Sequence, residues 1–274
     1  MENPVKVFKF GGASVKDVES IKHLENILSS FREDSIVMVI SAIGKTTNAL
    51  EEVVHAHAQQ TGNAIEKLEA IKQYHYQIAE ALCGVDEELF ASINDTFVEI
   101  DWVLEEDPEE NFDYMYDQIV SVGELLSTRI VAAFLKKMDF PIEWMDARDI
   151  IRTDNIYREG WVQWDETVNK ARKVMLPILE SGKWIVSQGF IGSTSENFTT
   201  TLGREGSDYT AAIFAYCIGA ESVTIWKDVP GVLNADPRYF ENALLLNQIS
   251  YREAIELAFY GASVIHPKTL QPLQ

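Results

Sequence analysis

Basic side chains are scarce in this chain of 274 residues. It carries 23 lysines and arginines against 43 aspartates and glutamates, which gives a net charge of −20. This balance argues against nucleic acid and against an anionic membrane surface as partners, because both repel a polyanion. An acidic protein that handles an anionic substrate needs local positive charge. Single lysines and arginines beside glycine-bearing loops are therefore the first candidates for binding residues.

Cysteine is also scarce, and metal-type histidine spacing and long apolar runs are missing. The two cysteines, Cys83 and Cys217, lie far apart, which excludes a disulfide framework and indicates a reducing compartment. His55 and His57 are two residues apart and would diverge on a helix, and no metal site is expected. We expect no signal peptide, and no apolar run approaches the ~18–20 residues of a membrane span. We expect a soluble, cytoplasmic protein.

The first part of the chain repeats a strand, a polar loop and a helix. Val5 to Phe10 reads as a strand that ends in Gly11-Gly12, and the apolar periodicity of Val15 to Ser30 predicts a helix. Ser14 and Asp17 resemble a capping box at its start. Ser35 to Ser41 predicts a fully buried strand, followed by the polar loop Ala42 to Thr47. This order favours an α/β fold with a largely parallel sheet and ligands at the carboxyl ends of its strands.

The remaining pattern continues this alternation. We expect helices near 113–138, 165–180, 207–218 and 251–260, and strands near 141–146, 183–188 and 222–226. Gly123 lies inside the first of these helices, where glycine costs ~1 kcal/mol against alanine, so it predicts a close approach by a ligand or a neighbouring element. Taken alone, the adjacent Glu124 reads as a side chain on the exposed face.

The stretch from Thr199 to Ala212 is the strongest local signal. It is a polar loop that enters an apolar helix, with Ser207 as the expected N-cap and Asp208 in the first turn. Arg204 stands just before it, with a guanidinium shaped for a carboxylate or phosphate. Together with Lys9 beside Gly11 and Gly12, it indicates an anion site without the spacing of a P-loop. An ordinary capped loop is the alternative interpretation.

Seven short motifs are spread over nearly the whole chain. They are KFGGASV from Lys9, GELLST from Gly123, GFIG from Gly189, TTTLGREGSDYTAA from Thr199, WKDVPG from Trp226, ADPR from Ala235 and YGASVIHP from Tyr260. In content and order these motifs resemble those of the aspartokinase family, and their joint occurrence by chance is negligible.

The resemblance implies an amino-acid-kinase fold, a three-layer αβα sandwich with a largely parallel sheet of about eight strands. Residues 1–274 would form one catalytic domain, with an aspartate-binding lobe over about 1–200 and a nucleotide-binding lobe over about 201–274. The implied reaction transfers the γ-phosphoryl group of ATP, with Mg²⁺, to the side-chain carboxylate of L-aspartate. The product, 4-phospho-L-aspartate, begins lysine, threonine and methionine synthesis. The side-chain carboxylate is already a nucleophile, so the enzyme needs no general base. It has to align the two substrates and neutralise the charge of the phosphates.

The resemblance also assigns roles to the matching residues. Lys9 would contact the transferring phosphoryl group, and Asp208 would organise the lysines at the reaction centre. Arg204 would pair with the α-carboxylate of aspartate. Glu124 would take the α-ammonium, which reverses the exposed-face interpretation. The other matches are Thr47 and Ser207 for aspartate, Gly11, Gly12 and Ser41 at the phosphates, and Lys227, Asp228, Leu233, Arg238 and Ser263 for the nucleotide.

Four departures from the family pattern bear on activity. Glu205 replaces a glycine, Lys227 a threonine, Leu233 a tyrosine, and Ser263 a lysine that helps to neutralise the nucleotide phosphates. Loss of one preorganised donor at developing charge typically costs ~3–4 kcal/mol. Our hypothesis is that Lys227 partly replaces the missing lysine. The alternative is that Lys227 is a surface lysine without a role at the phosphates and that the enzyme is slow.

Two other functions compete with the aspartokinase interpretation. One is another acyl-phosphate-forming amino-acid kinase, for glutamate or a related acid. The other is a nucleotide- or amino-acid-binding regulatory protein that is catalytically impaired, which Glu205 and Ser263 would favour. Aspartokinases usually continue into two small regulatory ACT domains after this point, and we expect their absence here to reflect truncation. A homodimer is compatible with the resemblance, and the sequence does not decide the oligomeric state.

Overall fold

The computed structural model describes residues 4–261 and 264–274 of the chain. Its main sheet has five parallel strands in the order β3-β4-β2-β1-β7. These strands are β1 (Val5–Phe10), β2 (Ser35–Ile40), β3 (Ile142–Met145), β4 (Trp184–Gln188) and β7 (Ser222–Trp226). A separate antiparallel pair joins β5 (Ile191–Ser193) and β6 (Thr199–Thr201). The α/β class and the parallel sheet are confirmed, but the main sheet has five strands, fewer than the resemblance implied.

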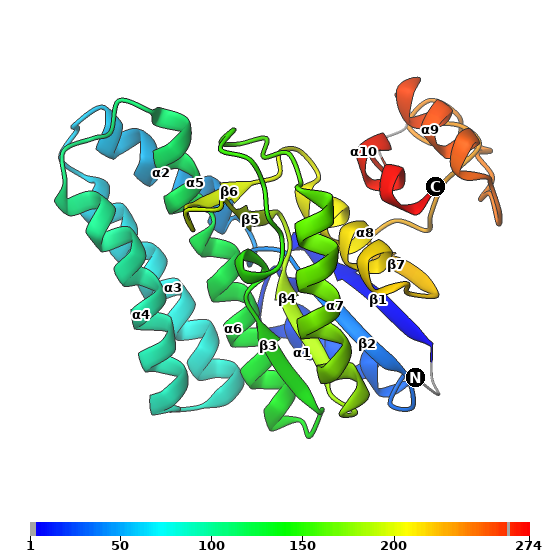
Figure 1. Cartoon of the computed structure of the whole chain (residues 1–274), viewed down its shortest axis with the longest axis horizontal. Helices are drawn as coiled ribbons and strands as arrows, with labels where there is room; N and C mark the ends of the chain where they lie inside the picture. The colour runs from blue at the N-terminus through cyan, green and yellow to red at the C-terminus, as the bar shows by residue number, and fades with distance from the viewer. Residues whose placement is uncertain (1–3, 262–263) are drawn as a thin grey trace.

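Helices cover both faces of this sheet, which gives the expected three layers (Figure 1). One face is covered by α1 (Val18–Ser29) and α6 (Val122–Lys137), and the other by α7 (Trp164–Glu180) and α8 (Gly206–Ile218). Further helices pack on the α6 side. They are α2 (Thr46–Ala58), α3 (Ala64–Cys83), α4 (Glu87–Glu105) and α5 (Phe112–Val120). The short helices α9 (Tyr251–Phe259) and α10 (Pro267–Leu270) lie together beyond α8 (Figure 1).

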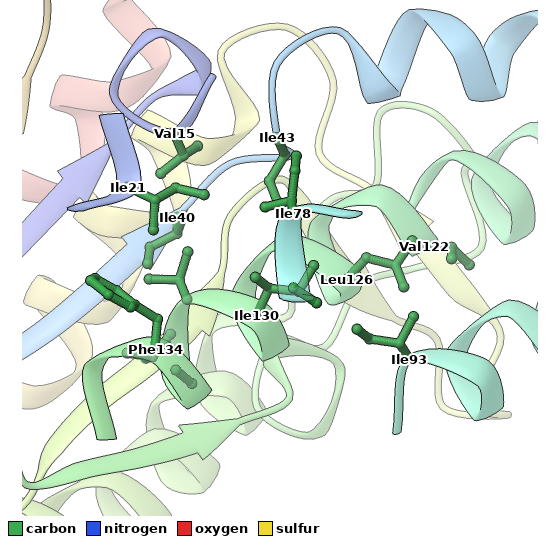
Figure 2. Packing of buried hydrophobic residues seen from close by; sticks show 14 of the residues in the cluster. Val15, Ile21, Ile40, Ile43, Ile78, Ile93, Val122, Leu126, Ile130 and Phe134 are labelled. Atoms are coloured by element: carbon green, nitrogen blue, oxygen red, sulfur yellow. The ribbon is translucent and has the colours of Figure 1, made fainter. Parts of the chain in front are cut away.

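Alternation along β1 decides which side chain reaches which layer. Val5 and Val7 join the apolar cluster under α7 and α8, whereas Phe8 and Phe10 join the cluster under α1 and α6. Figure 2 shows part of that second cluster, with contributions from α1, β2 and α6. Since successive side chains of a strand point to opposite faces, Lys9 shares the face of Val7 and points toward α8.

Two predicted helices differ in their bounds. The helix expected from Val15 begins at Val18, because Asp17 is its N-cap and accepts a hydrogen bond from the Ser20 N–H at 2.8 Å. Gly12–Val15 forms a separate 3₁₀ turn. The helix expected over 113–138 is interrupted at Ser121, which separates α5 from α6.

The stretch Phe112–Lys137 passes a length-and-composition test for a membrane span, contrary to the expectation from the sequence. Its most apolar window is 83% buried inside the protein. The apolar character of these residues is therefore accounted for by packing in the core, because core helices that are hydrophobic all round pass the same test.

Candidate active site

A cavity of about 740 Å³ opens at the carboxyl ends of the central strands. Such a position is where ligands bind in open α/β sheets. The cavity brings together many of the residues that the sequence singled out: Lys9, Gly12, Ser41, Thr47, Glu124, Arg204, Ser207 and Asp208.

Two lysines meet one carboxylate at the edge of this cavity. Asp208 is fully buried in the first turn of α8, and its Oδ1 lies 2.6 Å from Lys9 Nζ. Its Oδ2 lies 3.0 Å from Lys227 Nζ. These are ion-pair distances, although neither oxygen has a hydrogen bond of acceptable geometry. Lys9 lies in β1 and Lys227 directly follows β7, the neighbouring strand, which pairs with β1 up to Phe10 and Trp226.

Lys227 has two further neighbours at this point. Its Nζ donates a hydrogen bond to the carbonyl oxygen of Val264 at 2.7 Å and lies 3.9 Å from Glu205 Oε2. The interpretation of Lys227 as an isolated surface lysine does not fit this arrangement. Glu205, which stands where the family usually has a glycine, therefore places a carboxylate near Lys227.

Close backbone packing fixes the start of α8. A Cβ atom at Gly189 would come within 2.4 Å of the Ser207 Cβ, and one at Gly206 within 2.7 Å of the Phe190 ring. The predicted N-cap at Ser207 was wrong. Glu205 precedes the helix in a left-handed conformation, with φ of 55°, and its side chain makes no capping hydrogen bond. Ser207 instead lies within the first turn and lines the cavity.

Glu124 lies in the first turn of α6 and is only 4% exposed. Burial raises the pKa of this carboxyl to about 8, against the opposing effects of the Ala42 backbone N–H and the Lys9 charge. Its Oε2 has no hydrogen-bond partner among the described residues. A buried acceptor without a partner costs free energy until a donor arrives, so Glu124 suits a cationic ligand group.

The neighbouring Gly123 explains why α6 can come this close. A Cβ atom at this position would lie 3.1 Å from side-chain atoms of Leu50 and of Thr46, both on α2. The close approach predicted from a mid-helix glycine is confirmed, and the approaching element is a helix.

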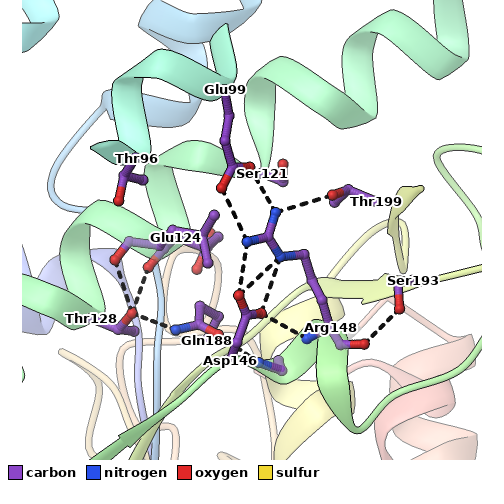
Figure 3. A network of polar contacts seen from close by, with 12 residues as sticks. Thr96, Glu99, Ser121, Glu124, Thr128, Asp146, Arg148, Gln188, Ser193 and Thr199 are labelled. Carbon is purple, nitrogen blue, oxygen red and sulfur yellow. Dashed lines mark hydrogen bonds and ion pairs between the residues drawn. The ribbon is translucent and has the colours of Figure 1, made fainter. Parts of the chain in front are cut away.

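A polar network supports the wall behind Glu124 (Figure 3). The Thr128 hydroxyl accepts hydrogen bonds from Gln188 Nε2 at 2.6 Å and Trp144 Nε1 at 3.0 Å. Nearby, the Arg148 guanidinium pairs with Glu99 at 2.7 Å and with Asp146 at 2.8 Å. Charge-assisted hydrogen bonds of this kind join α4, the end of β3 and the β5–β6 pair into one frame.

Sequence reasoning missed one whole wall of the cavity. Residues 156–159 line it, together with Asp113 and Tyr116 of α5. Arg158 has a left-handed backbone, with φ of 66°, which costs a non-glycine residue about 1 kcal/mol. No local pattern marks this loop. The loop is held by Asp117 of α5, which is distant in sequence. Asp117 is fully buried, and burial raises the pKa of its carboxyl to about 6.

Several predicted nucleotide residues do not line this cavity. Asp228 is exposed, Leu233 forms an isolated bridge with Leu245, and Arg238 pairs with its own neighbour Asp236 at 2.7 Å. Gly11 also lies outside the cavity lining, although a Cβ atom there would be 3.0 Å from Lys9 Nζ. The predicted position Ser263 lies outside the described residues.

No group of three or more histidine, cysteine, aspartate or glutamate side chains could hold a metal ion within residues 4–261 and 264–274. The cavity instead mixes lysine and arginine with single carboxylates. This composition suits a ligand that carries both an ammonium group and several anionic groups.

Comparisons with known proteins agree with this arrangement. The model of the amino acid kinase family matches residues 4–274. The chain is 36% identical over 268 residues to lysine-sensitive aspartokinase 3 of Escherichia coli, covering 98% of this chain and 59% of that protein. It is 33% identical over 276 residues to the chloroplastic aspartokinase 1 of Arabidopsis thaliana, covering 97% of this chain and 47% of that protein.

Among solved structures, aspartokinase III of E. coli in complex with aspartate and ADP is similar, with a TM-score of 0.88 and 35% identity. The match covers 98% of this chain and 59% of that one. The chain thus spans between about half and three-fifths of the length of these relatives.

Proposed function

The chain belongs to the amino acid kinase family, and from this premise we propose that it is the catalytic part of an aspartokinase. It would transfer the γ-phosphoryl group of ATP to the side-chain carboxylate of L-aspartate. The observation that carries the proposal is the buried Asp208 between Lys9 and Lys227, in one cavity with Glu124 and Arg204. The aspartate and ADP bound by the similar E. coli enzyme support it.

The cavity offers one group for each charge of aspartate. Glu124 would receive the α-ammonium, because its buried Oε2 lacks a partner. Arg204 would pair with the α-carboxylate, and its guanidinium has no ion pair or hydrogen bond to any residue between 4 and 261 or between 264 and 274 that would compete. Thr47 and Ser207 line the same space and would donate hydroxyl hydrogen bonds.

The remaining carboxylate of aspartate would then face the lysines. One of its oxygens forms a bond to the γ-phosphorus, the bond from that phosphorus to the β–γ bridging oxygen breaks, and ADP leaves. No proton has to move, because the attacking carboxylate is ionised. Lys9 and Lys227 would neutralise charge on the phosphoryl oxygens, and Asp208 would keep both ammonium groups in place.

ATP is a substrate of this reaction. Gly11, Gly12 and Ser41 would approach its phosphates, and Lys227, Asp228, Leu233, Arg238 and Ser263 belong to the segment that would cover the nucleotide. Mg²⁺ would enter bound to the phosphates and neutralise their charge. Such an ion needs few protein ligands, and the described part of the chain has no cluster of three or more ligating side chains. We place the protein in the cytoplasm, and we retain a homodimer as an expectation.

The test is ADP release with ATP, Mg²⁺ and L-aspartate, with hydroxylamine present to trap the acyl phosphate. L-glutamate in a parallel assay separates aspartokinase from another acyl-phosphate-forming kinase. Aspartate-dependent hydroxamate is the expected result. Glu205, which lies 3.9 Å from Lys227, favours the impaired binding protein as the second candidate. That candidate would bind ATP and aspartate and form no hydroxamate.

A further inference from the structure

A loop that we call the strap, residues 154–160, forms one wall of the cavity. The Asp154 carboxylate accepts hydrogen bonds from the Ile156 and Trp161 N–H groups at 3.2 and 2.9 Å. At the other end, the Gly160 N–H donates to the Thr201 carbonyl oxygen at 2.9 Å. Both ends of the strap are therefore tied down, and its middle is turned toward the cavity.

The middle of the strap is held by one buried carboxylate. Asp117 Oδ2 accepts a hydrogen bond from the Arg158 N–H at 2.8 Å and another from the Thr201 N–H at 2.8 Å. Its Oδ1 accepts from the Thr201 hydroxyl at 2.8 Å. Asp117 is fully buried, so these hydrogen bonds form away from solvent. They fix Arg158 in a left-handed conformation that a non-glycine residue adopts only when its surroundings enforce it.

The Arg158 side chain is oriented but weakly paired. Its guanidinium lies 4.2 Å from the centre of the Tyr116 ring, a stacking contact that limits its movement. The charged partner found for it within residues 4–261 and 264–274 is Asp113, at 3.4 Å, and both side chains are about half exposed. An exposed pair at this distance contributes little, so an incoming carboxylate can take the place of Asp113.

The Arg158 guanidinium supplies positive charge that the two lysines cannot supply alone. Lys9 and Lys227 are both engaged by Asp208, whereas an acidic amino acid and a nucleotide together bring several negative charges. Arg158 and Arg204 are the two guanidinium groups in the cavity lining. A planar guanidinium matches a carboxylate with two parallel hydrogen bonds, which a monoamide cannot accept in the same way.

We propose that Arg158 is a second carboxylate-binding residue of the cavity, and that Asp117 is the positioning residue that holds it there. This inference rests on the proposed function, because it takes an acidic amino acid as the ligand. Arg158 pairs with the side-chain carboxylate, while the lysines act on the phosphoryl oxygens, and it contributes to selection of a dicarboxylic amino acid over its monoamide. Asp117 touches no ligand and acts through the Arg158 backbone.

The first test is Arg158→Gly. Glycine accepts the left-handed backbone and keeps the N–H that Asp117 binds, so this variant removes the guanidinium and leaves the strap in place. We expect KM for L-aspartate to rise about 10- to 100-fold, the usual effect of losing a hydrogen bond to a charged group. We expect kcat and KM for ATP to stay within about twofold. Arg252→Ala removes an exposed guanidinium that does not line the cavity and is the control for net charge.

The second test is Asp117→Asn, alone and combined with Arg158→Gly. Both N–H groups donate to the same oxygen, Oδ2, and the amide replaces this charged acceptor with a neutral, weaker one, so we expect KM for L-aspartate to rise by up to about tenfold. In the Arg158→Gly background the same change should have no further effect on KM, because the residue through which it acts is gone. If Asp117 had only a structural role, Asp117→Asn would instead lower kcat and the thermal midpoint of unfolding. Its effect would then add to that of Arg158→Gly.

Calorimetric binding of L-aspartate separates this inference from the proposed function, since binding needs no turnover. A wild-type chain that binds aspartate but gives no hydroxamate would overturn the aspartokinase proposal alone. Equal aspartate affinity in the wild type and Arg158→Gly would overturn the inference alone. Absence of aspartate binding by the wild type would overturn both.

Discussion

Lys9 and Asp208 form a buried ion pair across the junction of β1 and α8. Their closest atoms, Nζ and Oδ1, are 2.6 Å apart, and their side chains are 8% and 0% exposed. Burying two charges is costly, and their mutual attraction repays the cost only while both are present. The pair therefore makes the fold depend on the same groups that the proposed reaction uses.

Asp208→Asn should impair both properties. It leaves Lys9 buried without a counter-charge and frees Lys227, so we expect a loss of about 3 kcal/mol in the free energy of unfolding. We also expect kcat to fall by about 10²–10³-fold, because the two ammonium groups lose their fixed positions. Urea unfolding and the hydroxamate assay measure the two effects. Wild-type kcat in this variant would contradict the role given to Asp208.

Lys227→Thr tests the hypothesis that this lysine replaces the one absent at position 263. Its Nζ lies 3.0 Å from Asp208 Oδ2, beside the reaction centre. We expect kcat to fall by about 10²–10³-fold, the effect of removing one preorganised donor. Adding Ser263→Lys to this variant should restore a large part of the lost activity. Unchanged turnover in Lys227→Thr would refute the hypothesis.

Glu124 should make aspartate affinity depend on pH. Its pKa of about 8 means that it is protonated near neutral pH and must lose a proton before it binds an ammonium group. We expect KM for aspartate to fall as pH rises toward about 8, and aspartate binding at pH 7 to release a proton. Calorimetry in two buffers of different ionisation enthalpy measures this release. Glu124→Gln should show none.

The same pKa predicts how stability changes with pH. The folded value of about 8 lies above the ordinary value of 4.5, so the protonated carboxyl is the form that the fold favours. Its contribution to stability is complete below about 4.5 and is lost as pH rises through about 8. Glu124→Gln should therefore gain stability relative to the wild type over this window. Parallel unfolding curves at all pH values would contradict the prediction.

Gly11→Ala should affect activity more than stability. The backbone at Gly11, with φ of −78° and ψ of 175°, suits any residue, but the new Cβ atom would lie 3.0 Å from Lys9 Nζ. The ammonium group must then give way to the new methyl group, which changes its position relative to Asp208. We expect kcat to fall about tenfold, by analogy with the sensitivity of catalysis to displacements of about 1 Å, and the thermal midpoint to change little. Full activity would show that Lys9 tolerates the added methyl group.

The sequence predicted the sheet well because strands buried on both faces leave a continuous apolar signal. The runs at Val5 to Phe10 and Ser35 to Ser41 lie within a residue of β1 and β2. The helix caps were harder. Ser207 has a favoured N-cap side chain, yet the N-cap of α8 is Glu205, two residues earlier, beside the close packing at Gly189 and Gly206. Tertiary contacts of this kind leave no local pattern.

The residues that line the cavity were predicted where a motif is contiguous and missed where the chain brings distant parts together. Lys9, Glu124, Arg204 and Asp208 lie in glycine-bearing motifs, and the structure brings them into one cavity. Arg158 lies in a loop without a motif, and it is held there by Asp117, 41 residues earlier in the chain. The contact between them depends on how α5 packs, which the sequence alone does not reveal.

The position of β1 in the middle of the sheet has a consequence for synthesis on the ribosome. β1 emerges well before β7, yet β7 is one of its two neighbours, and Lys6 pairs with Ser222. Until residue 226 has left the ribosome, β7 cannot pair with β1, and that edge of β1 stays open. Over the same period Asp208 has Lys9 but not Lys227 as a partner. Pairings this distant in sequence are slow to close and expose unpaired edges meanwhile. Nascent chains stalled before β7 should therefore bind chaperones that recognise extended apolar segments, and release should coincide with emergence of β7.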